Sequence, residues 1–401
     1  MDHAELDALL TPEAMELLES LDPVTTAADV ARAVTRLRRD GHDPDRVSAV
    51  VGQVRLRQRA ETKFGSFSHR MLFTRAGLEQ ATRMSVSAHH AGRFAHAEMR
   101  LVADLGCGIG GDSLALASLG LGVRAVDVDE VTAALAAYNL SPFRSGGAVV
   151  DVRHGRAEGA DLTGVDAVWL DPARRTSGHS ETRRVSADDY SPSLDWAFDL
   201  ARRLPAGIKL GPAHDRDLIP ADVEAQWIGV DGSTVELVLW SGSLAREGVR
   251  RAALVIRGDR VHELTAPGDA DDEPVRELGS FVHEPEGAVI RARLVGEVAR
   301  ALAAGPVAEG IAYLTGDAEL TSPFVQTFRV RETLPTDPKA LGKALRERGI
   351  GTLEIKKRGV DIDPAMLRKK LKLQGDGSAT LIVTRIEGRR VAILADRVRA
   401  V

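Results

Sequence analysis

A glycine-rich turn carries the sharpest chemical signal in this sequence. Gly106, Gly108 and Gly111 fit the spacing GxGxxG directly after the apolar run 101–105 and before a helical pattern. Glycines at this spacing let the backbone approach a nucleotide ligand closely, and dinucleotide-binding enzymes share the pattern. The spacing by itself therefore leaves a nicotinamide dinucleotide site open as an alternative.

Carboxylates at the ends of apolar runs favour a different ligand. Asp104 lies two residues before the first glycine, where a carboxylate suits an ammonium and a sulfonium group better than a pyrophosphate. Asp127 ends the next run, and its two oxygens can accept both hydroxyls of a ribose. Asp171 and Pro172 end a later run. We expect these side chains to meet, because open α/β sheets bind ligands at the carboxyl ends of their strands.

The surrounding pattern predicts the elements that hold these residues. Residues 1–95 show helical spacing of apolar residues, and from 101 to 210 short apolar runs alternate with helical segments. This alternation predicts βαβ units and a largely parallel sheet. Three apolar runs within 227–258 have no helix between them and predict antiparallel strands at one edge of the sheet. Residues 287–305 predict one amphipathic helix that bridges two domains.

Several segments resemble a known family. DLGCGIGGD, VDVDEVTAALAAYN and WLDPARR resemble the first, second and fourth motifs of class I S-adenosylmethionine-dependent methyltransferases. The lead-in LFTRAGLEQAT resembles that of RNA-guanosine methyltransferases of the trimethylguanosine-synthase type. The segment GTLEIKKRGVDIDPAMLRKKLKL resembles the THUMP-like domain fused to one group of bacterial methyltransferases. Together these resemblances cover residues 60–401.

The resemblance implies an α/β fold, with a Rossmann-like class I methyltransferase sheet, a helical N-terminal segment and a small α+β THUMP-like domain. The expected division is a helical segment at 1–90, the methyltransferase domain at 91–265, an acidic loop and bridging helix at 266–325, and a basic THUMP-like domain at 326–401.

The resemblance also implies S-adenosylmethionine as the cofactor. The residues that its motifs place around the cofactor are Asp104, Gly106, Gly108 and Gly110 for the methionine part, Asp127 for the ribose, and Ala157 and Glu158 for the adenine edge. Arg156 stands where the family usually carries an acidic residue. Adenine recognition would then fall to Glu158 or to backbone groups.

The fourth motif implies the transfer step. In amino-methyltransferases an Asp/Asn-Pro-Pro-aromatic element accepts a hydrogen bond from the amine and stacks on a base. Here Asp171 and Pro172 keep the polar acceptor and the first proline, but Ala173 and Arg174 replace the second proline and the aromatic residue. Asp171 can still orient or deprotonate an N–H or O–H group. Arg174 can stack on a base or clamp a phosphate, or it can pair with nearby acids.

Charge points to a partner, although the net charge is −5. Residues 331–401 hold 17 Lys and Arg against 9 Asp and Glu, and seven of the nine lysines lie there. We expect RNA to bind this basic region. The residues expected to contact it are Lys356, Lys357 and Arg358, presented together at the end of a strand, and Lys369 and Lys370 on a helix. The alternative is that these cations only keep the region soluble.

These features predict a methyltransferase that modifies a nitrogen of an RNA base. The alternatives are methylation of a small molecule or protein, and a non-catalytic RNA-binding module that senses the cofactor. The single cysteine, Cys107, excludes a disulfide framework and a cysteine-based zinc site, and no metal site is expected from the scattered histidines. No apolar run approaches the roughly 20 residues of a membrane span. With no signal-like N-terminus, we expect a cytoplasmic protein.

Overall fold

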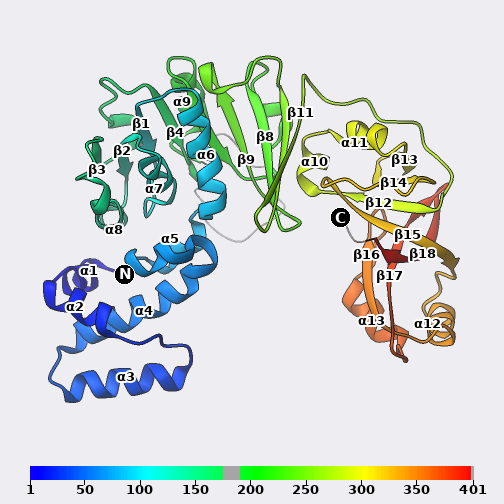
Figure 1. Ribbon diagram of the computed structural model, residues 1–401, viewed down its shortest axis with the longest axis horizontal. Helices are drawn as coiled ribbons and strands as arrows, with labels where there is room; N and C mark the ends of the chain where they lie inside the picture. Colours follow the sequence, from blue (N-terminus) through cyan, green and yellow to red (C-terminus); the bar gives the residue numbers. More distant parts are fainter. Residues whose placement is uncertain (175–189, 399–401) are drawn as a thin grey trace. The chain divides into compact units, whose positions relative to one another are not determined.

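The computed structural model describes residues 1–174 and 190–398 (Figure 1). The chain divides into two compact units. The first unit contains Met1–Leu210 and Leu239–Ala245, and the second contains Gly211–Val238 and Arg246–Val401.

Helices form the start of the first unit, which confirms the prediction for residues 1–95. They are α1 (His3–Leu9), α2 (Pro12–Ser20), α3 (Ala27–Arg39), α4 (Pro44–Phe64), α5 (Arg75–Gln80) and α6 (Met84–His96), with a 3-10 turn at Gly65–Arg70. Thr11 caps α2, because its side chain accepts a hydrogen bond from the Ala14 backbone N–H. Val50 and Val54 of α4 share a core with Leu9 of α1 and Leu18 of α2.

A nine-stranded sheet confirms the Rossmann-like fold class. Its strand order is β11-β10-β8-β9-β7-β4-β1-β2-β3. The strands are β1 (Leu101–Leu105), β2 (Gly122–Asp127), β3 (Val150–His154), β4 (Ala167–Leu170), β7 (Ala206–Leu210), β8 (Glu224–Val230), β9 (Ser233–Ser241), β10 (Arg251–Arg257) and β11 (Arg260–Ala266). Strands β3, β2, β1, β4 and β7 are parallel neighbours. Their carboxyl ends therefore lie at the same edge, as the motif positions require.

Three helices connect or cover these parallel strands. They are α7 (Gly111–Ser118), α8 (Glu130–Asn139) and α9 (Leu194–Ala201). Helix α7 contacts β1 and β2, α8 contacts β2 and β3, and α9 contacts β7. A short antiparallel pair, β5 (Ala173–Arg174) with β6 (Tyr190–Ser191), follows the fourth strand.

The prediction of antiparallel strands within 227–258 is wrong for one pair. Strand β10 runs parallel to β8, with Arg251 opposite Ala225. Only Asp231 and Gly232 separate β8 from β9, so the chain reverses there and β9 occupies one side of β8. The chain then reverses a second time, and β10 pairs with the other side of β8. It therefore runs in the direction of β8, and only its pairing with β11 is antiparallel.

The prediction of one helix at 287–305 is also wrong. The segment forms α10 (Gly287–Arg291) and α11 (Val295–Ala301), both in the second unit. Arg293 adopts a φ of 59° between them, which ends the first helix. Leu294 and Val298 are buried. The apolar pattern that indicated one long helix is therefore satisfied by two short ones.

A seven-stranded sheet organises the rest of the second unit, in the order β13-β14-β12-β15-β18-β17-β16. The elements are β12 (Phe281–Pro285), β13 (Gly305–Ala308), β14 (Ile311–Gly316), β15 (Val325–Leu334), α12 (Pro338–Glu347), β16 (Ile350–Lys357), α13 (Pro364–Leu371), β17 (Gly377–Ile386) and β18 (Arg389–Arg397). Leu341, Leu345 and Leu371 of the two helices pack in one core with sheet residues such as Leu381 and Leu394.

Aromatic residues fill the core beside the parallel strands. The rings of Trp169 on β4 and Trp240 on β9 lie 5.8 Å apart, and Phe94 meets both edge-on. A Cβ atom at Gly207 on β7 would lie 2.7 Å from each tryptophan. Close-packed interiors tolerate added atoms poorly. Glycine is therefore required at position 207 by its neighbours.

We expect Gly207→Ala to lower the free energy of unfolding by about 1–3 kcal/mol, because the added methyl group must displace a tryptophan ring. The midpoint of urea unfolding measures this loss. Gly52→Ala is the matched control, since Gly52 lies within α4 with no atom within 4 Å of the added Cβ. That change should stabilise the helix by up to about 1 kcal/mol. Equal midpoints for the two variants would contradict the packing argument.

Candidate cofactor and acceptor site

The glycine loop connects β1 to α7 in a backbone conformation that suits glycine. Gly106, Gly108 and Gly110 have φ values of 99°, 55° and 86°, which side chains disfavour. A Cβ atom at Gly106 would lie 3.1 Å from the carbonyl oxygen of Asp171. The loop after β1 therefore approaches the end of β4 closely, and it brings two of the predicted motifs together.

Asp104 lies beneath this loop and is only 1% exposed. Its Oδ2 accepts a hydrogen bond of 2.5 Å from the Ser113 hydroxyl. Within the described part of the chain its Oδ1 has no hydrogen-bond partner. Burial raises the pKa of Asp104 to about 8, and the hydrogen bond from Ser113 opposes that rise. A buried acceptor without a partner fits the ammonium group of S-adenosylmethionine.

Asp127 ends β2 and is fixed by two backbone groups. Its Oδ2 accepts from the Gly108 N–H and its Oδ1 from the Asp129 N–H, both at 2.9 Å. Partial burial raises the pKa of Asp127, and the two hydrogen bonds reduce this effect. Each carboxylate oxygen retains a second acceptor position. The side chain is therefore held in place with acceptor positions to spare, and its role at the ribose stays a prediction.

The expected adenine edge follows β3. Ala157 and Glu158 form a short 3-10 turn at Ala157–Gly159. Glu158 Oε1 accepts a hydrogen bond of 3.3 Å from Arg156, the residue that replaces the family's acid. Arg156 and Glu158 thus form a local pair. The role of Ala157 and Glu158 at the adenine stays a prediction.

Asp171 follows β4 and forms an ion pair with a residue that the sequence analysis missed. Its Oδ2 lies 2.5 Å from Nζ of Lys209 on β7, and its side chain is 34% exposed. Pro172 beside it is buried. The Lys209 ammonium also donates to the Thr82 hydroxyl over 2.9 Å. A charged residue within the buried strand AGIKL is the one signal that could have identified Lys209 from sequence.

The hydrogen bonds of Lys209 extend through Thr82 to a buried carboxylate, Asp112. Thr82 Oγ1 donates to Asp112 Oδ2 over 2.9 Å, and His90 Nδ1 lies 2.8 Å from Asp112 Oδ1. Burial opposes ionisation of Asp112, but contacts with His90 and the charge of Lys209 outweigh it and lower its pKa. The polar chain from α6 to Asp171 therefore carries an ionised carboxylate at its centre.

Arg174 lies in β5, where its backbone is opposite Tyr190. Its side chain falls outside the part of the chain that the structure describes. The predicted stacking or phosphate contact of Arg174 therefore stays a prediction.

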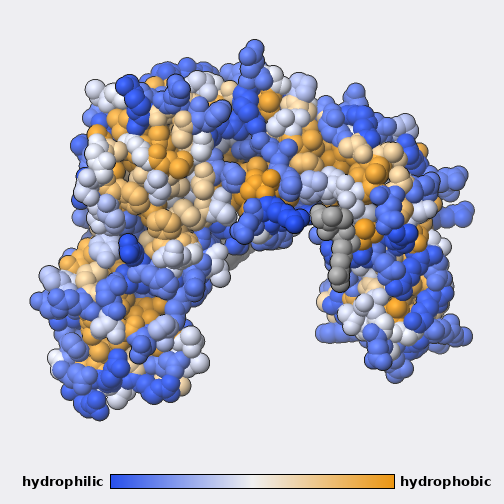
Figure 2. Space-filling view, in the orientation of Figure 1, coloured by the Kyte–Doolittle hydropathy of each residue, from blue (hydrophilic) through white to orange (hydrophobic). Residues whose placement is uncertain are grey.

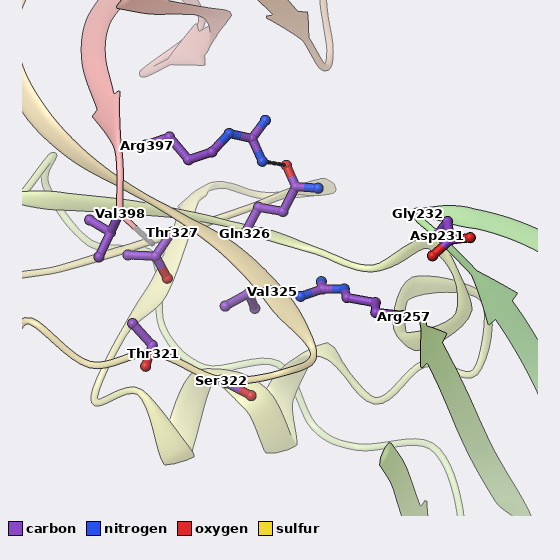
Figure 3. Close-up of a pocket in the computed structure, with 10 residues that line it drawn as sticks. All are labelled: Asp231, Gly232, Arg257, Thr321, Ser322, Val325, Gln326, Thr327, Arg397 and Val398. Carbon is purple, nitrogen blue, oxygen red and sulfur yellow. Dashed lines mark hydrogen bonds between the residues drawn. The ribbon is translucent and has the colours of Figure 1, made fainter. Parts of the chain in front are cut away.

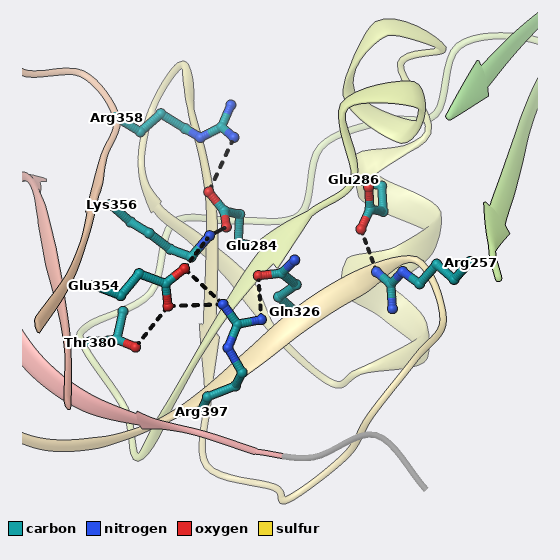
Figure 4. Close-up of polar contacts among 9 residues, drawn as sticks. All are labelled: Arg257, Glu284, Glu286, Gln326, Glu354, Lys356, Arg358, Thr380 and Arg397. Carbon is teal, nitrogen blue, oxygen red and sulfur yellow. Dashed lines mark hydrogen bonds and ion pairs between the residues drawn. The ribbon is translucent and has the colours of Figure 1, made fainter. Parts of the chain in front are cut away.

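Lys356, Lys357 and Arg358 are not presented to solvent together as expected, because Lys356 and Arg358 lie beside Glu284 (Figure 4). Lys356 Nζ donates to Glu284 over 2.6 Å, and its side chain is 16% exposed. Arg358 lies 3.8 Å from the same carboxylate. Lys357 is exposed, because successive residues of a strand point to opposite faces. Lys356 and Arg358 therefore neutralise Glu284, which lies outside the basic region 331–401.

Lys369 and Lys370 are exposed in the last turn of α13, which agrees with their predicted presentation on a helix. Figure 2 shows mainly hydrophilic residues on the visible face of the region with α12 and α13. These two lysines and Lys357 remain the predicted cations that face solvent.

A cavity of about 300 Å³ lies in the second unit and contains none of the predicted site residues (Figure 3). Two arginines and several hydroxyl groups line it. Arg257 pairs with the buried Glu286, and Arg397 donates to both oxygens of Glu354. Because both guanidinium groups already have carboxylate partners, the cavity offers little net attraction for an anion.

In residues 1–174 and 190–398, no group of three or more His, Cys, Asp or Glu side chains could hold a metal ion. No helix in the same ranges is long and apolar enough to cross a membrane.

Known proteins resemble this chain over most of its length. A THUMP domain-like family model matches residues 325–397, and a domain of unknown function (DUF8688) matches residues 2–60. Curated proteins of two Mycobacterium tuberculosis strains, each named an uncharacterized S-adenosylmethionine-dependent methyltransferase, are 33% identical over 352 residues. The match covers 85% of this chain and 94% of theirs.

A solved structure shares the fold over most of the chain. The crystal structure of a putative methyltransferase from Porphyromonas gingivalis W83 superposes with a TM-score of 0.72 at 21% identity. The match covers 94% of this chain and 100% of that chain.

We expect Asp127→Ala to weaken binding of S-adenosylhomocysteine by about 1.5–3 kcal/mol, because it removes a charged acceptor and releases the Gly108 N–H. Titration calorimetry measures this change. Asp151→Ala on β3 is the control, since Asp151 pairs only locally with Arg153 within the described residues. Unchanged affinity in Asp127→Ala would remove Asp127 from the cofactor site.

Proposed function

The chain belongs to the family of S-adenosylmethionine-dependent methyltransferases, and we propose that it transfers the methyl group to a nitrogen of an RNA base. The position of Asp171 carries this proposal. Its carboxylate is partly exposed at the carboxyl end of β4, and its backbone lies against the glycine loop. A hydrogen-bond acceptor is thus held beside the loop expected to cradle the methionine part of the cofactor.

Asp171 and Lys209 supply what the transfer needs from the protein. S-adenosylmethionine, when bound, provides an electrophilic methyl group on a positively charged sulfur. Asp171 accepts a hydrogen bond from the acceptor N–H and so turns the nitrogen lone pair toward that methyl group. Asp171 would also take the proton that the nitrogen loses on methylation, and the cofactor would supply the leaving group by keeping the C–S electron pair on sulfur. Lys209 holds the carboxylate in place through the ion pair.

RNA as the acceptor is supported by the C-terminal region. The THUMP domain-like match covers 325–397, and Lys357, Lys369 and Lys370 face solvent there. We assign phosphate contacts to these three lysines. Lys356 and Arg358 instead fix β16 to Glu284 on β12.

We expect Asp171→Ala to reduce methyl transfer by about 100-fold or more, because it removes the side chain that accepts the N–H hydrogen bond and takes the proton. The assay uses labelled S-adenosylmethionine and total RNA from cells that lack this protein. Affinity for S-adenosylhomocysteine should stay within a few fold. Asp195→Ala is the control, on an exposed position of α9. If the wild-type protein labels a protein or small-molecule extract but no RNA, the acceptor is not RNA.

We expect Lys369→Gln with Lys370→Gln to weaken RNA binding and to make its salt dependence shallower. Loss of two phosphate contacts lowers the slope of log K against log salt by about 1.4 for single-stranded RNA. Fluorescence anisotropy of a labelled RNA at several salt concentrations measures both quantities. Lys356→Met is the contrast, since it breaks the pair with Glu284 and should leave the slope unchanged. A slope reduced only in Lys356→Met would contradict the assignment.

A further inference from the structure

Asp104 is the carboxylate of the site with a buried oxygen that has no hydrogen-bond partner among the described residues. Its side chain is buried, Ser113 satisfies Oδ2, and Oδ1 has no partner among the described residues. An ionised carboxylate is strongly disfavoured when it is buried with an unsatisfied oxygen. Such a group becomes stable in two ways, by binding a proton or by contacting a cation.

The charges around Asp104 do not supply that cation. The titratable groups that face it or its direct neighbours are Asp112 on α7, Asp171 after β4, Lys209 on β7, Cys107 in the glycine loop, Asp127 on β2 and His90 on α6. Lys209 contacts Asp171 and Thr82, and His90 contacts Asp112. The charges of Asp112 and Asp171 oppose ionisation of Asp104. Negative groups therefore predominate around it, and the cations nearby have other carboxylate partners.

We infer that Asp104 recognises the amino group of the cofactor by exchanging a proton for it, so that binding of the ammonium releases the proton of a neutral Asp104 carboxylic acid. The proton leaves Oδ1 or Oδ2 for solvent, and the resulting carboxylate pairs with the ligand's ammonium group. This inference goes beyond methyl transfer and does not depend on RNA being the acceptor. It makes Asp104 the residue that distinguishes ligands with an amino acid part from ligands without one.

The pKa of Asp104 sets the direction of the effect. Because burial raises it to about 8, the empty site holds a neutral acid at pH 6–7. The ammonium favours the ionised form, so a proton must leave when the ligand binds. Apparent affinity then rises with pH, by at most tenfold for each unit below about 8. The thiol of Cys107 does not contribute, since burial and the charges of Asp104 and Asp127 raise its pKa.

The test is titration calorimetry of the full chain with S-adenosylhomocysteine at pH 6.0 and 7.0, in two buffers that differ in ionisation enthalpy. At these pH values the ligand's amino group is an ammonium. We expect close to one proton released for each ligand bound, and affinity several-fold higher at pH 7.0. 5′-Methylthioadenosine has the nucleoside and thioether but no amino group, and it should bind without proton release. No release with S-adenosylhomocysteine, or equal release with both ligands, would overturn the inference.

Variants separate Asp104 from its neighbours. Asp104→Asn should bind S-adenosylhomocysteine more weakly, with affinity independent of pH and no proton released. Ser113→Ala removes the hydrogen bond that favours the carboxylate, so affinity should still be rising at pH values where the wild type has levelled off. Asp127→Asn should weaken the binding of both ligands and retain the proton release that accompanies binding of S-adenosylhomocysteine. If Asp104→Asn does not fold, the two-ligand comparison on the wild type and Ser113→Ala decides. Proton release that persists in folded Asp104→Asn would overturn the inference.

Discussion

The close approach of two backbone segments is the constraint on which the site depends. Gly106 lies so near the carbonyl of Asp171 that a Cβ atom would come within 3.1 Å of it. This approach is possible because β1 lies between β2 and β4 in a parallel arrangement, so the segments after all three strands emerge at one edge. The residues expected to hold the cofactor and the residue proposed to hold the acceptor are therefore positioned by the same sheet.

Three aspartates of the site, Asp112, Asp104 and Asp171, differ in their burial and in their hydrogen-bond or ion-pair partners. Asp112 is buried with His90 and Thr82 as partners, and its pKa falls. Asp104 is also buried, but the Ser113 hydroxyl is its one side-chain partner among the described residues, and its pKa rises to about 8. Asp171 is partly exposed and paired with Lys209. Hydrogen-bond partners, rather than burial alone, thus separate a structural anion from a group that exchanges a proton.

Features that depend on local spacing could be predicted from the sequence, and those that depend on distant partners could not. The glycine loop and the positions of Asp104, Asp127 and Asp171 follow from one strand and its next turn. Lys209 is 38 residues from Asp171, and only the neighbouring positions of β4 and β7 bring the two together. The sequence places Lys356 in the basic region 331–401, whereas its partner Glu284 lies on another strand outside that region. Arg293 likewise divides a helix whose apolar spacing is unbroken.

The sheet of the second unit limits how its function can be separated from the rest of the chain. The THUMP domain-like match begins at residue 325, but β15 also pairs with β12, where Val282 lies opposite Phe328. Val282, Phe328, Ile382 and Ile393 belong to one buried cluster. A chain cut at 325/326 would lose β15, one of the two partners of β12, and expose this cluster. Weaker RNA binding after truncation would then report misfolding as readily as lost contacts. Point substitutions of exposed lysines keep the sheet intact, and they alone isolate the contribution of charge.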